Sequence, residues 1–172
     1  MNSLKKVIGV ICLTIFAFTA SAQVSKEHAF QAMDNLVGGE WHLKAQYSAQ
    51  NSMEKDIKVT KILNGSTYLV ETSGNIATTG HRYGLRNQGM RGWSKEFSKM
   101  EFVEADVFGG FVTGEVAIEG MDILYHYVYA GQKMTEAWIY KGPNIYEFIL
   151  GVRNDRGQWI EMELNGQVSR KK

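Results

Sequence analysis

The chain has 172 residues, with 19 basic and 18 acidic side chains and a formal charge of +1. This near balance argues against nucleic acid as a partner, because nucleic-acid-binding domains usually carry a basic stripe. The length fits one ordinary domain with enough chain to bury a core.

Residues 1–22 have the three zones of a secretory signal peptide. Two lysines precede the apolar run 7–18, and Ala-Ser-Ala at 20–22 forms a small-x-small cleavage site. The run is too short for a bilayer span, which needs roughly 20 residues, and no later stretch is long enough. We therefore expect a single mature domain over 23–172, exported to the periplasm or secreted, with no membrane span.

Cys12 is the only cysteine, and it lies inside this leader. It follows Ile11, whereas lipoprotein signals place a small residue before the modified cysteine. We therefore expect neither a lipid anchor nor a disulfide in the mature chain. Because the leader also carries two basic residues, cleavage changes the formal charge to −1.

A short helix is the first element that we predict after the leader. The pattern opens at Ser25 and ends at Gly38-Gly39. Beyond it, glycine-marked turns recur about every ten residues, with aromatic and β-branched residues between them, which predicts a barrel or sandwich. The apolar face of the predicted helix comprises Phe30, Met33, Leu36 and Val37.

The next elements are strands, and two of them have a definite register. Asn64-Gly65 is a strong signal for a two-residue type I′ hairpin, which sets Val59 opposite Val70. Residues 77–101 contain four glycines and give no register. The first strand is predicted over 40–49, with a buried face made of Trp41, Leu43, Ala45 and Tyr47.

Two turns in the last third of the chain predict the pairing of three strands. A two-residue turn at 131–132 sets His126 opposite Ala137. A four-residue turn at 141–144 then sets Ala137 opposite Phe148. Apolar residues meet across both pairs of strands, so the two turns predict one continuous surface.

A third turn extends this surface to the last strand. The loop 155–157 sets Phe148 opposite Leu164, whereas a slip of one residue would place Glu161 and Glu163 there instead. The predicted inner surface consists of Leu124, His126, Val128, Thr135, Ala137, Ile139, Tyr146, Phe148, Leu150, Ile160, Met162 and Leu164.

The alternate residues of the same strands form the predicted outer wall. Glu136 and Glu147 lie there, and two carboxylates can in principle act as a general acid/base pair. A mixture of acids and tyrosines behind an apolar face is, however, typical of an amphipathic outer wall. Its other members are Tyr125, Tyr127, Trp138 and Tyr140.

Gly39-Glu40-Trp41, at the head of the first strand, resembles the Gly-x-Trp opening of lipocalin-like (calycin) barrels. The chain looks most like the lipocalin-like families of uncharacterised secreted bacterial proteins. In lipocalins this tryptophan closes one barrel end and packs against an arginine from the last strand, a place that Arg170 or Arg153 could take here. The resemblance implies an all-β fold: a closed antiparallel up-and-down barrel of about ten strands, with a short N-terminal helix and a cavity for a small ligand.

His126 is the first candidate for a polar contact in such a cavity, because its predicted neighbours are apolar and Ala137 leaves room opposite it. It could instead be a buried neutral histidine with a hydrogen-bond partner. A third reading makes it the axial ligand of haem, as in one branch of similar barrels.

The run 81–86, continued by Arg91 and Trp93, clusters four potentially basic groups near a loop. It could receive a carboxylate or phosphate at the barrel mouth. It could equally be a solvated strand edge. The predicted ligand contacts are therefore His126, Ala137, Phe148, Tyr146, Leu150, Arg82 and Arg86.

The sequence has no Gly-x-Ser-x-Gly or His-Glu-x-x-His motif, no phosphate loop, no dinucleotide fingerprint and no histidine pair at metal spacing. We expect no catalytic residue, metal or resident cofactor. The first hypothesis is a barrel that binds a small hydrophobic or amphipathic ligand. The alternatives are a packed barrel that contacts a protein partner or forms a homodimer, and a cofactor-free enzyme that uses His126 and a tyrosine.

Overall fold

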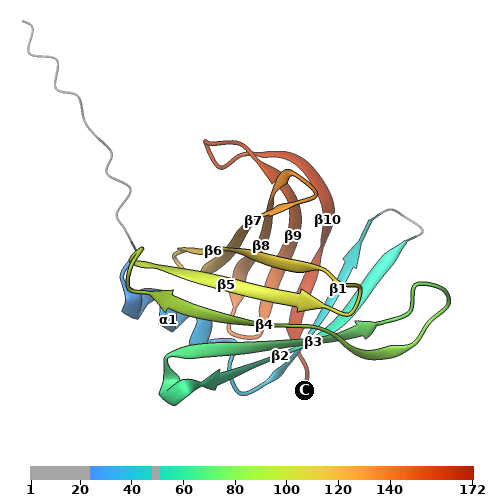
Figure 1. Ribbon diagram of the computed structural model, residues 1–172, viewed down its shortest axis with the longest axis horizontal. Helices are drawn as coiled ribbons and strands as arrows, with labels where there is room; N and C mark the ends of the chain where they lie inside the picture. Colours follow the sequence, from blue (N-terminus) through green and yellow to red (C-terminus); the bar gives the residue numbers. More distant parts are fainter. Residues whose placement is uncertain (1–23, 48–50) are drawn as a thin grey trace, which may run out of the picture.

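The computed structural model describes residues 24–47 and 51–172, so the predicted leader lies outside the described residues. One helix, α1 (Lys26–Asp34), precedes ten strands in this part of the chain (Figure 1). Each strand pairs with its neighbour in sequence, and pairing of the first with the last closes the barrel. The predicted all-β up-and-down barrel is confirmed. Its strands are β1 Glu40–Gln46, β2 Ser52–Ile62, β3 Thr67–Asn75, β4 Tyr83–Ser94, β5 Lys99–Asp106, β6 Phe111–Glu119, β7 Asp122–Tyr129, β8 Gln132–Gly142, β9 Ile145–Arg153 and β10 Trp159–Arg170.

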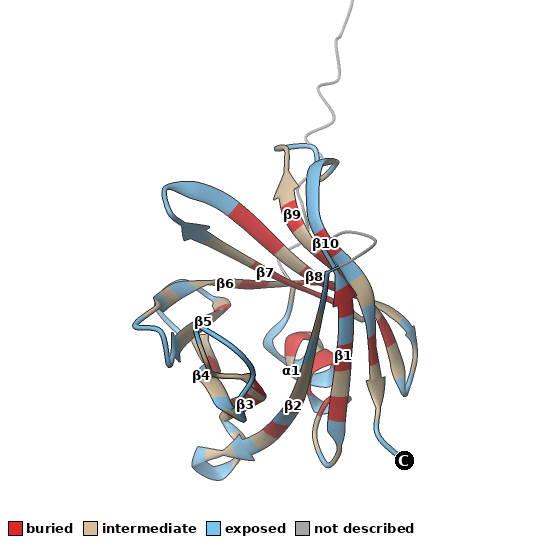
Figure 2. Ribbon diagram, turned by 90° about the vertical axis from the view of Figure 1, so that its right-hand side faces the viewer, coloured by how far each residue is buried: buried red, intermediate tan, exposed pale blue. Residues whose placement is uncertain are grey.

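The helix α1 covers one end of the barrel, and Figure 2 shows it behind the ring of strands. Ser25 caps the helix by accepting a hydrogen bond from the backbone N–H of His28 at 3.2 Å. The Tyr68 hydroxyl donates to the Asp34 carboxylate at 2.7 Å and so ties β3 to α1. The predicted helix is confirmed. The end of the barrel that α1 covers is called here the closed end. The loops that follow β1, β3, β5, β7 and β9 lie at the opposite, open end. In the described part of the chain, no helix has the length and apolar character needed to cross a membrane.

The Gly-x-Trp motif holds the closed end together. Trp41 is fully buried, and its Nε1 donates to the backbone carbonyl of Leu36 at 2.9 Å. The Arg170 guanidinium lies 4.6 Å from the centre of the Trp41 ring. A Cβ atom on Gly39 would lie 2.4 Å from Arg170 Nη1, so a side chain there would displace the arginine. Of the two predicted arginines, Arg170 packs on the tryptophan, whereas Arg153 lies at the open end.

The register predicted for the first hairpin is confirmed, since Val59 faces Val70 across β2 and β3. Asn64 (φ +53°) and Gly65 (φ +81°) occupy the left-handed region that a type I′ turn requires. The predicted first strand is shorter than expected, because β1 ends at Gln46 and Tyr47 is 58% exposed.

The register between β7 and β8 differs from the prediction by two residues. The turn uses Ala130 and Gly131, both with positive φ, so that the glycine takes its second position. His126 therefore faces Thr135 and not Ala137. Because a shift of two residues leaves every side chain on its own face, this error alone would not move any residue from inside to outside.

The register between β8 and β9 differs by one residue, which does exchange the faces. An irregularity between Tyr140 and Gly142 inserts a residue into β8, so that Trp138 and not Ala137 faces Phe148. Phe148 faces the interior, so its partner Trp138 faces the interior too. The residues of β7 and β8 that were predicted for the outer wall turn inward together with Trp138. The inward-facing members of that wall are Tyr125, Tyr127, Glu136, Trp138 and Tyr140, whereas Glu147 stays outside and pairs with Lys141 at 2.9 Å.

The last hairpin begins in the predicted register, with Trp159 opposite Arg153, and then departs from it. Two irregularities in β10 bring Leu164 opposite Leu150, where Met162 was expected. The predicted inner surface is right for Tyr146, Phe148, Leu150 and Leu164. It is wrong for Ile160 and Met162, which are 68% and 57% exposed, and for the outward-facing Leu124, His126, Val128, Thr135, Ala137 and Ile139.

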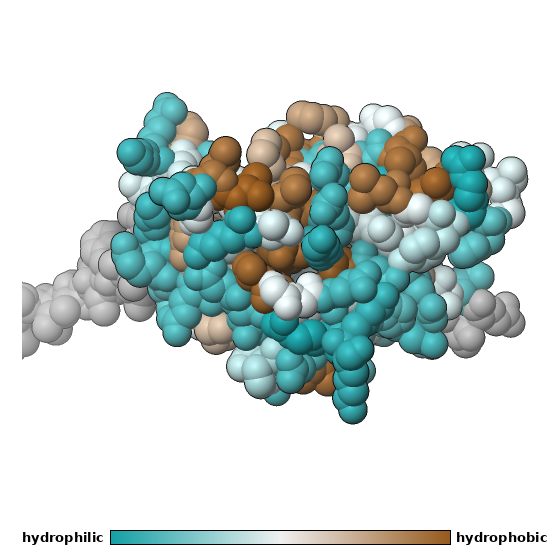
Figure 3. Space-filling model, turned by 90° about the horizontal axis from the view of Figure 1, so that it is seen from below, coloured by the Kyte–Doolittle hydropathy of each residue, from teal (hydrophilic) through white to brown (hydrophobic). Residues whose placement is uncertain are grey.

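The outside of the barrel is mixed in character. The face in Figure 3 is mainly hydrophilic, with hydrophobic side chains gathered towards its upper half. Most of the large apolar side chains that are exposed lie on loops and strand ends at the open end of the barrel. This apolar rim consists of Tyr47, Tyr83, Leu85, Val107, Phe108, Phe111, Val128, Tyr129, Ile160 and Met162.

Candidate functional site

Among the described residues, a cavity of about 270 Å³ and a smaller one of about 50 Å³ lie in the interior of the barrel. The larger cavity reaches Tyr47 and Tyr129 at the open end, and the smaller one reaches Leu36 and Leu43 at the closed end. Together they lie at the lower edge of the roughly 300–1,000 Å³ that small-molecule sites occupy. Six side chains line both cavities and form the interior polar cluster: Lys55, Asn87, Arg91, Glu104, Tyr125 and Glu136.

The larger cavity is amphipathic because its two sides come from different strands. Most of its charged side chains project from β2, β4 and β5. The opposite side, called here the apolar wall, is built mainly by β8, β9 and β10, where strand alternation directs bulky apolar residues inward. The apolar wall consists of Val112, Met134, Phe148, Leu150 and Leu164.

Arg91 is the most deeply placed charge, with 5% of its surface exposed. Its Nη2 lies 2.5 Å from Glu104 Oε2, and the other oxygen of that carboxylate accepts a hydrogen bond from Asn87. The rings of Phe102 and Tyr125 each lie 5.3 Å from the guanidinium carbon and hold its plane. Among the described residues, neither Arg91 Nε nor Nη1 has a hydrogen bond of normal geometry, although the Tyr125 hydroxyl lies close enough to interact with the guanidinium. Buried donors are rarely left without a partner, because the unpaired group costs about 1–3 kcal/mol.

Gly89 explains how the guanidinium fits against the sheet. A Cβ atom at this position would lie 2.6 Å from Arg91 Nη1 and 2.2 Å from the carbonyl oxygen of Val103. Gly89 is the next inward-facing position of β4 towards the open end, so Nη1 is turned in that direction. The missing side chain therefore lets the guanidinium pack directly against the backbone of β4.

Lys55 and Glu136 complete the charged part of the interior polar cluster. Glu136 Oε1 accepts from Trp138 Nε1 at 2.9 Å, while the Lys55 ammonium has no hydrogen bond or ion pair within the described part of the chain. Burial lowers the pKa of Lys55, and the charge of Glu136 partly offsets this effect. Burial likewise raises the pKa of Glu136, with Lys55 acting against it. Both groups are thus held nearer to their neutral forms than in water.

Comparison with known proteins bears on the fold. No protein-family model and no curated protein sequence matches the chain. The S-type phycobiliprotein lyase CPES from Guillardia theta is similar in structure, with a TM-score of 0.50 over 87% of this chain and 94% of that one, at 14% sequence identity. The fold is that of a lipocalin-like barrel. A redesigned β-barrel is also found, with a TM-score of 0.44 over 82% of this chain and 96% of that one, at 14% identity.

The structure of this lipocalin-like barrel separates the residues that the sequence predicted as ligand contacts. Phe148 and Leu150 line the larger cavity. Tyr146 is fully buried at the closed end, where its hydroxyl accepts from Asn35 Nδ2 at 2.7 Å and its ring packs edge-on against Trp41. Tyr146 thus supports the fold of the closed end, and the larger cavity begins beyond it, towards the open end.

The basic run in β4 is also divided. Arg82 is exposed on the loop before the strand. Arg86 lines the mouth of the larger cavity, donates to the backbone carbonyl of Asn75 at 2.5 Å and lies over the Phe108 ring at 4.8 Å. Arg91 lies in the interior. The strand β4 thus places Arg86 at the mouth of the barrel and Arg91 in its core.

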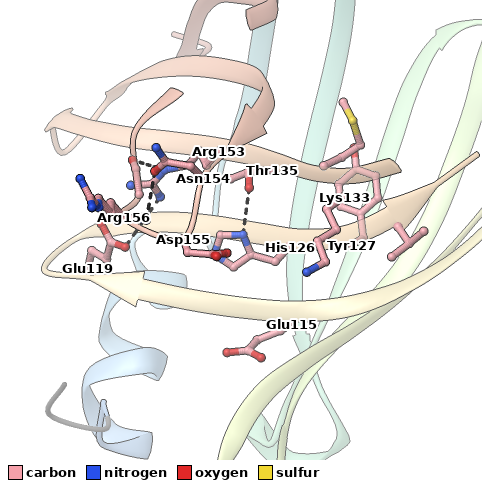
Figure 4. A pocket seen from close by; sticks show the side chains of 13 residues that line it. Glu115, Glu119, His126, Tyr127, Lys133, Thr135, Arg153, Asn154, Asp155 and Arg156 are labelled. Atoms are coloured by element: carbon pink, nitrogen blue, oxygen red, sulfur yellow. Dashed lines mark hydrogen bonds and ion pairs between the residues drawn. The ribbon is translucent and has the colours of Figure 1, made fainter. Parts of the chain in front are cut away.

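His126 and Ala137 do not line the interior. His126 faces an open groove of about 720 Å³ on the outside of the barrel, between β6, β7, β8 and the β9–β10 loop (Figure 4). Its Nδ1 is bonded to Thr135 Oγ1 at 3.0 Å, and burial together with the Arg153 cation lowers its pKa. The interior roles predicted for His126, as ligand contact or haem ligand, therefore have no geometric basis. In the described residues no three metal-binding side chains cluster.

A second group of titratable residues ties strands together on the outer surface. Asp56 accepts hydrogen bonds from His42 and Lys171, each at 2.8 Å, and from the Tyr83 hydroxyl. These bonds outweigh burial and lower the pKa of Asp56 to about 2. Because they occupy the carboxylate, we interpret this group as structural.

Proposed function

We propose that this protein binds a small amphipathic ligand inside its barrel. The observation that carries the proposal is the pairing of an apolar wall with buried polar groups that have no partner. A fully packed structural barrel would have little reason to retain such groups, because each one costs free energy while it stays unpaired. A bound molecule could both fill the space beside Phe148 and Leu150 and supply the missing partners.

The open end is the proposed route into the cavity. The larger cavity reaches Tyr47 and Tyr129, both members of the apolar rim. Exposed apolar patches on proteins commonly mark binding sites. An apolar ligand could therefore lose contact with water in two steps, first at the rim and then in the cavity.

We further propose that the protein acts after export, in the periplasm or outside the cell. The signal-peptide pattern of residues 1–22 supports this location. The pattern and the barrel together favour the group of secreted bacterial lipocalin-like proteins that the Gly-x-Trp motif suggested.

The proposal can be tested with N-phenyl-1-naphthylamine, a neutral probe that fluoresces in apolar surroundings. We expect saturable binding of one molecule per mature chain. Leu150→Trp adds a ring beside the cavity and should weaken binding by about tenfold or more, because the space is too small for both groups. The matched control Ile160→Trp places the same ring on the outer surface and should bind as the wild type does. Equal binding by both variants, or no saturable binding by the wild type, would contradict the proposal.

A further inference from the structure

The inner end of the cavity has the properties of a preformed site for an anion. Arg91 is held in place by its ion pair with Glu104 and by two aromatic rings, one of which brings the Tyr125 hydroxyl near the guanidinium, yet Nε and Nη1 make no hydrogen bond of normal geometry among the described residues. Arg91 lines both interior cavities, and the missing side chain of Gly89 leaves room for its guanidinium against the sheet. An arginine that is rigid, buried and incompletely paired is suited to bind a carboxylate, since charge-assisted hydrogen bonds are the strong ones.

A second basic side chain lines the same space. Lys55 projects from β2, and its ammonium has no hydrogen bond or ion pair in the part of the chain that the structure describes. It borders both interior cavities, as Arg91 does. A negative charge placed in the cavity would therefore face basic side chains from two different strands, and it would favour the charged form of Lys55, which burial disfavours by lowering the pKa.

The acids of the cavity do not cancel this attraction. Glu104 is already engaged by Arg91 and Asn87, and Asp106 accepts two backbone N–H groups of its own loop, each at 2.8 Å. Glu163 lies farther along β10 towards the open end than Leu164 does. Glu136 is the remaining acid of the inner end, and burial favours its neutral form by raising its pKa.

We propose that the ligand of this barrel carries a carboxylate, which Arg91 and Lys55 receive at the inner end while the apolar part lies along Phe148 and Leu150. This inference rests on the proposed function and adds the chemical class of the ligand. A neutral head group would pair fewer of the free donors, and a cationic one would face Arg91, Lys55 and Arg86.

Three probes of equal chain length separate the possibilities: octanoate, octan-1-ol and octylamine. In calorimetric titrations of the mature protein, octanoate should bind at least about tenfold more tightly than octan-1-ol, and octylamine should bind most weakly. In Arg91→Met the ratio of octanoate to octan-1-ol affinity should fall by about threefold or more, and any preference that is left comes from Lys55. Arg82→Met removes an exposed arginine near the mouth and should keep the wild-type ratio.

The substitution of Arg91 alone leaves Glu104 without its partner, so Arg91→Met/Glu104→Gln provides a second variant in which residue 104 carries no stranded charge. It should show the same loss of preference for octanoate. Equal affinity of the wild type for octanoate and octan-1-ol, or a preference in the double variant as large as that of the wild type, would overturn the carboxylate inference but leave ligand binding intact. If none of the three probes binds to the wild type, the proposed function itself fails.

Discussion

Replacing Trp41 with alanine should lower the free energy of unfolding by about 3–5 kcal/mol, the usual cost of emptying a buried aromatic site. Trp41 is fully buried and packs between the Arg170 guanidinium and the Tyr146 ring. It also donates to the backbone just after α1. The substitution should therefore loosen the helix and both strands that close the barrel.

Urea-induced unfolding followed by circular dichroism measures this loss. Trp159→Ala is a suitable control, because Trp159 is partly exposed near the β9–β10 loop and should cost less than about 1 kcal/mol. A loss below about 1 kcal/mol for Trp41→Ala would show that the Gly-x-Trp motif does not hold the closed end.

Arg91→Met should lower the free energy of unfolding by about 3 kcal/mol, because it leaves the Glu104 carboxylate in the interior without its cation. The pair is close, with 2.5 Å between Arg91 Nη2 and Glu104 Oε2, and the arginine side chain is 6% exposed. Adding Glu104→Gln removes the stranded charge, so the double variant should recover much of the loss.

Unfolding of the wild type, both single variants and the double variant in urea completes a double-mutant cycle. A positive coupling energy of about 1 kcal/mol or more is expected for residues in direct contact. Additive effects of the two substitutions would mean that the ion pair does not hold Arg91 in place, and the preformed anion site would then lose its main support.

The elements that were predicted well have strong local signals. The Asn64-Gly65 turn fixes the β2–β3 register, and Gly39 and Trp41 mark the closed end. The last third of the chain lacks such guidance, because its strands are apolar on both faces. Ala137 is buried on the outer face while Trp138 is buried on the inner one, so alternation cannot choose between them. A single inserted residue in β8 determines which face of the strand is turned inward, and the residues of the β8–β9 turn do not indicate that insertion.

The interior polar cluster could be predicted only in part. Lys55 lies two residues before Ile57 on the inner face of β2, and Glu104 lies two residues after Phe102 on β5, so alternation places both inside. Charged residues at such positions are readily assigned to solvent, because most of them are exposed in proteins. The free nitrogens of Arg91 depend on rotamers and on packing over Gly89, which no sequence pattern conveys.

Export remains a prediction from the leader, and binding inside the barrel is the central claim. A native mass spectrum of the mature protein, purified gently from its own host, tests that claim most directly. We expect the wild type to carry one additional small molecule of defined mass, and Leu150→Trp, prepared in parallel, to lose most of it. The bare polypeptide mass alone in the wild type, under conditions that preserve weak complexes, would contradict the account.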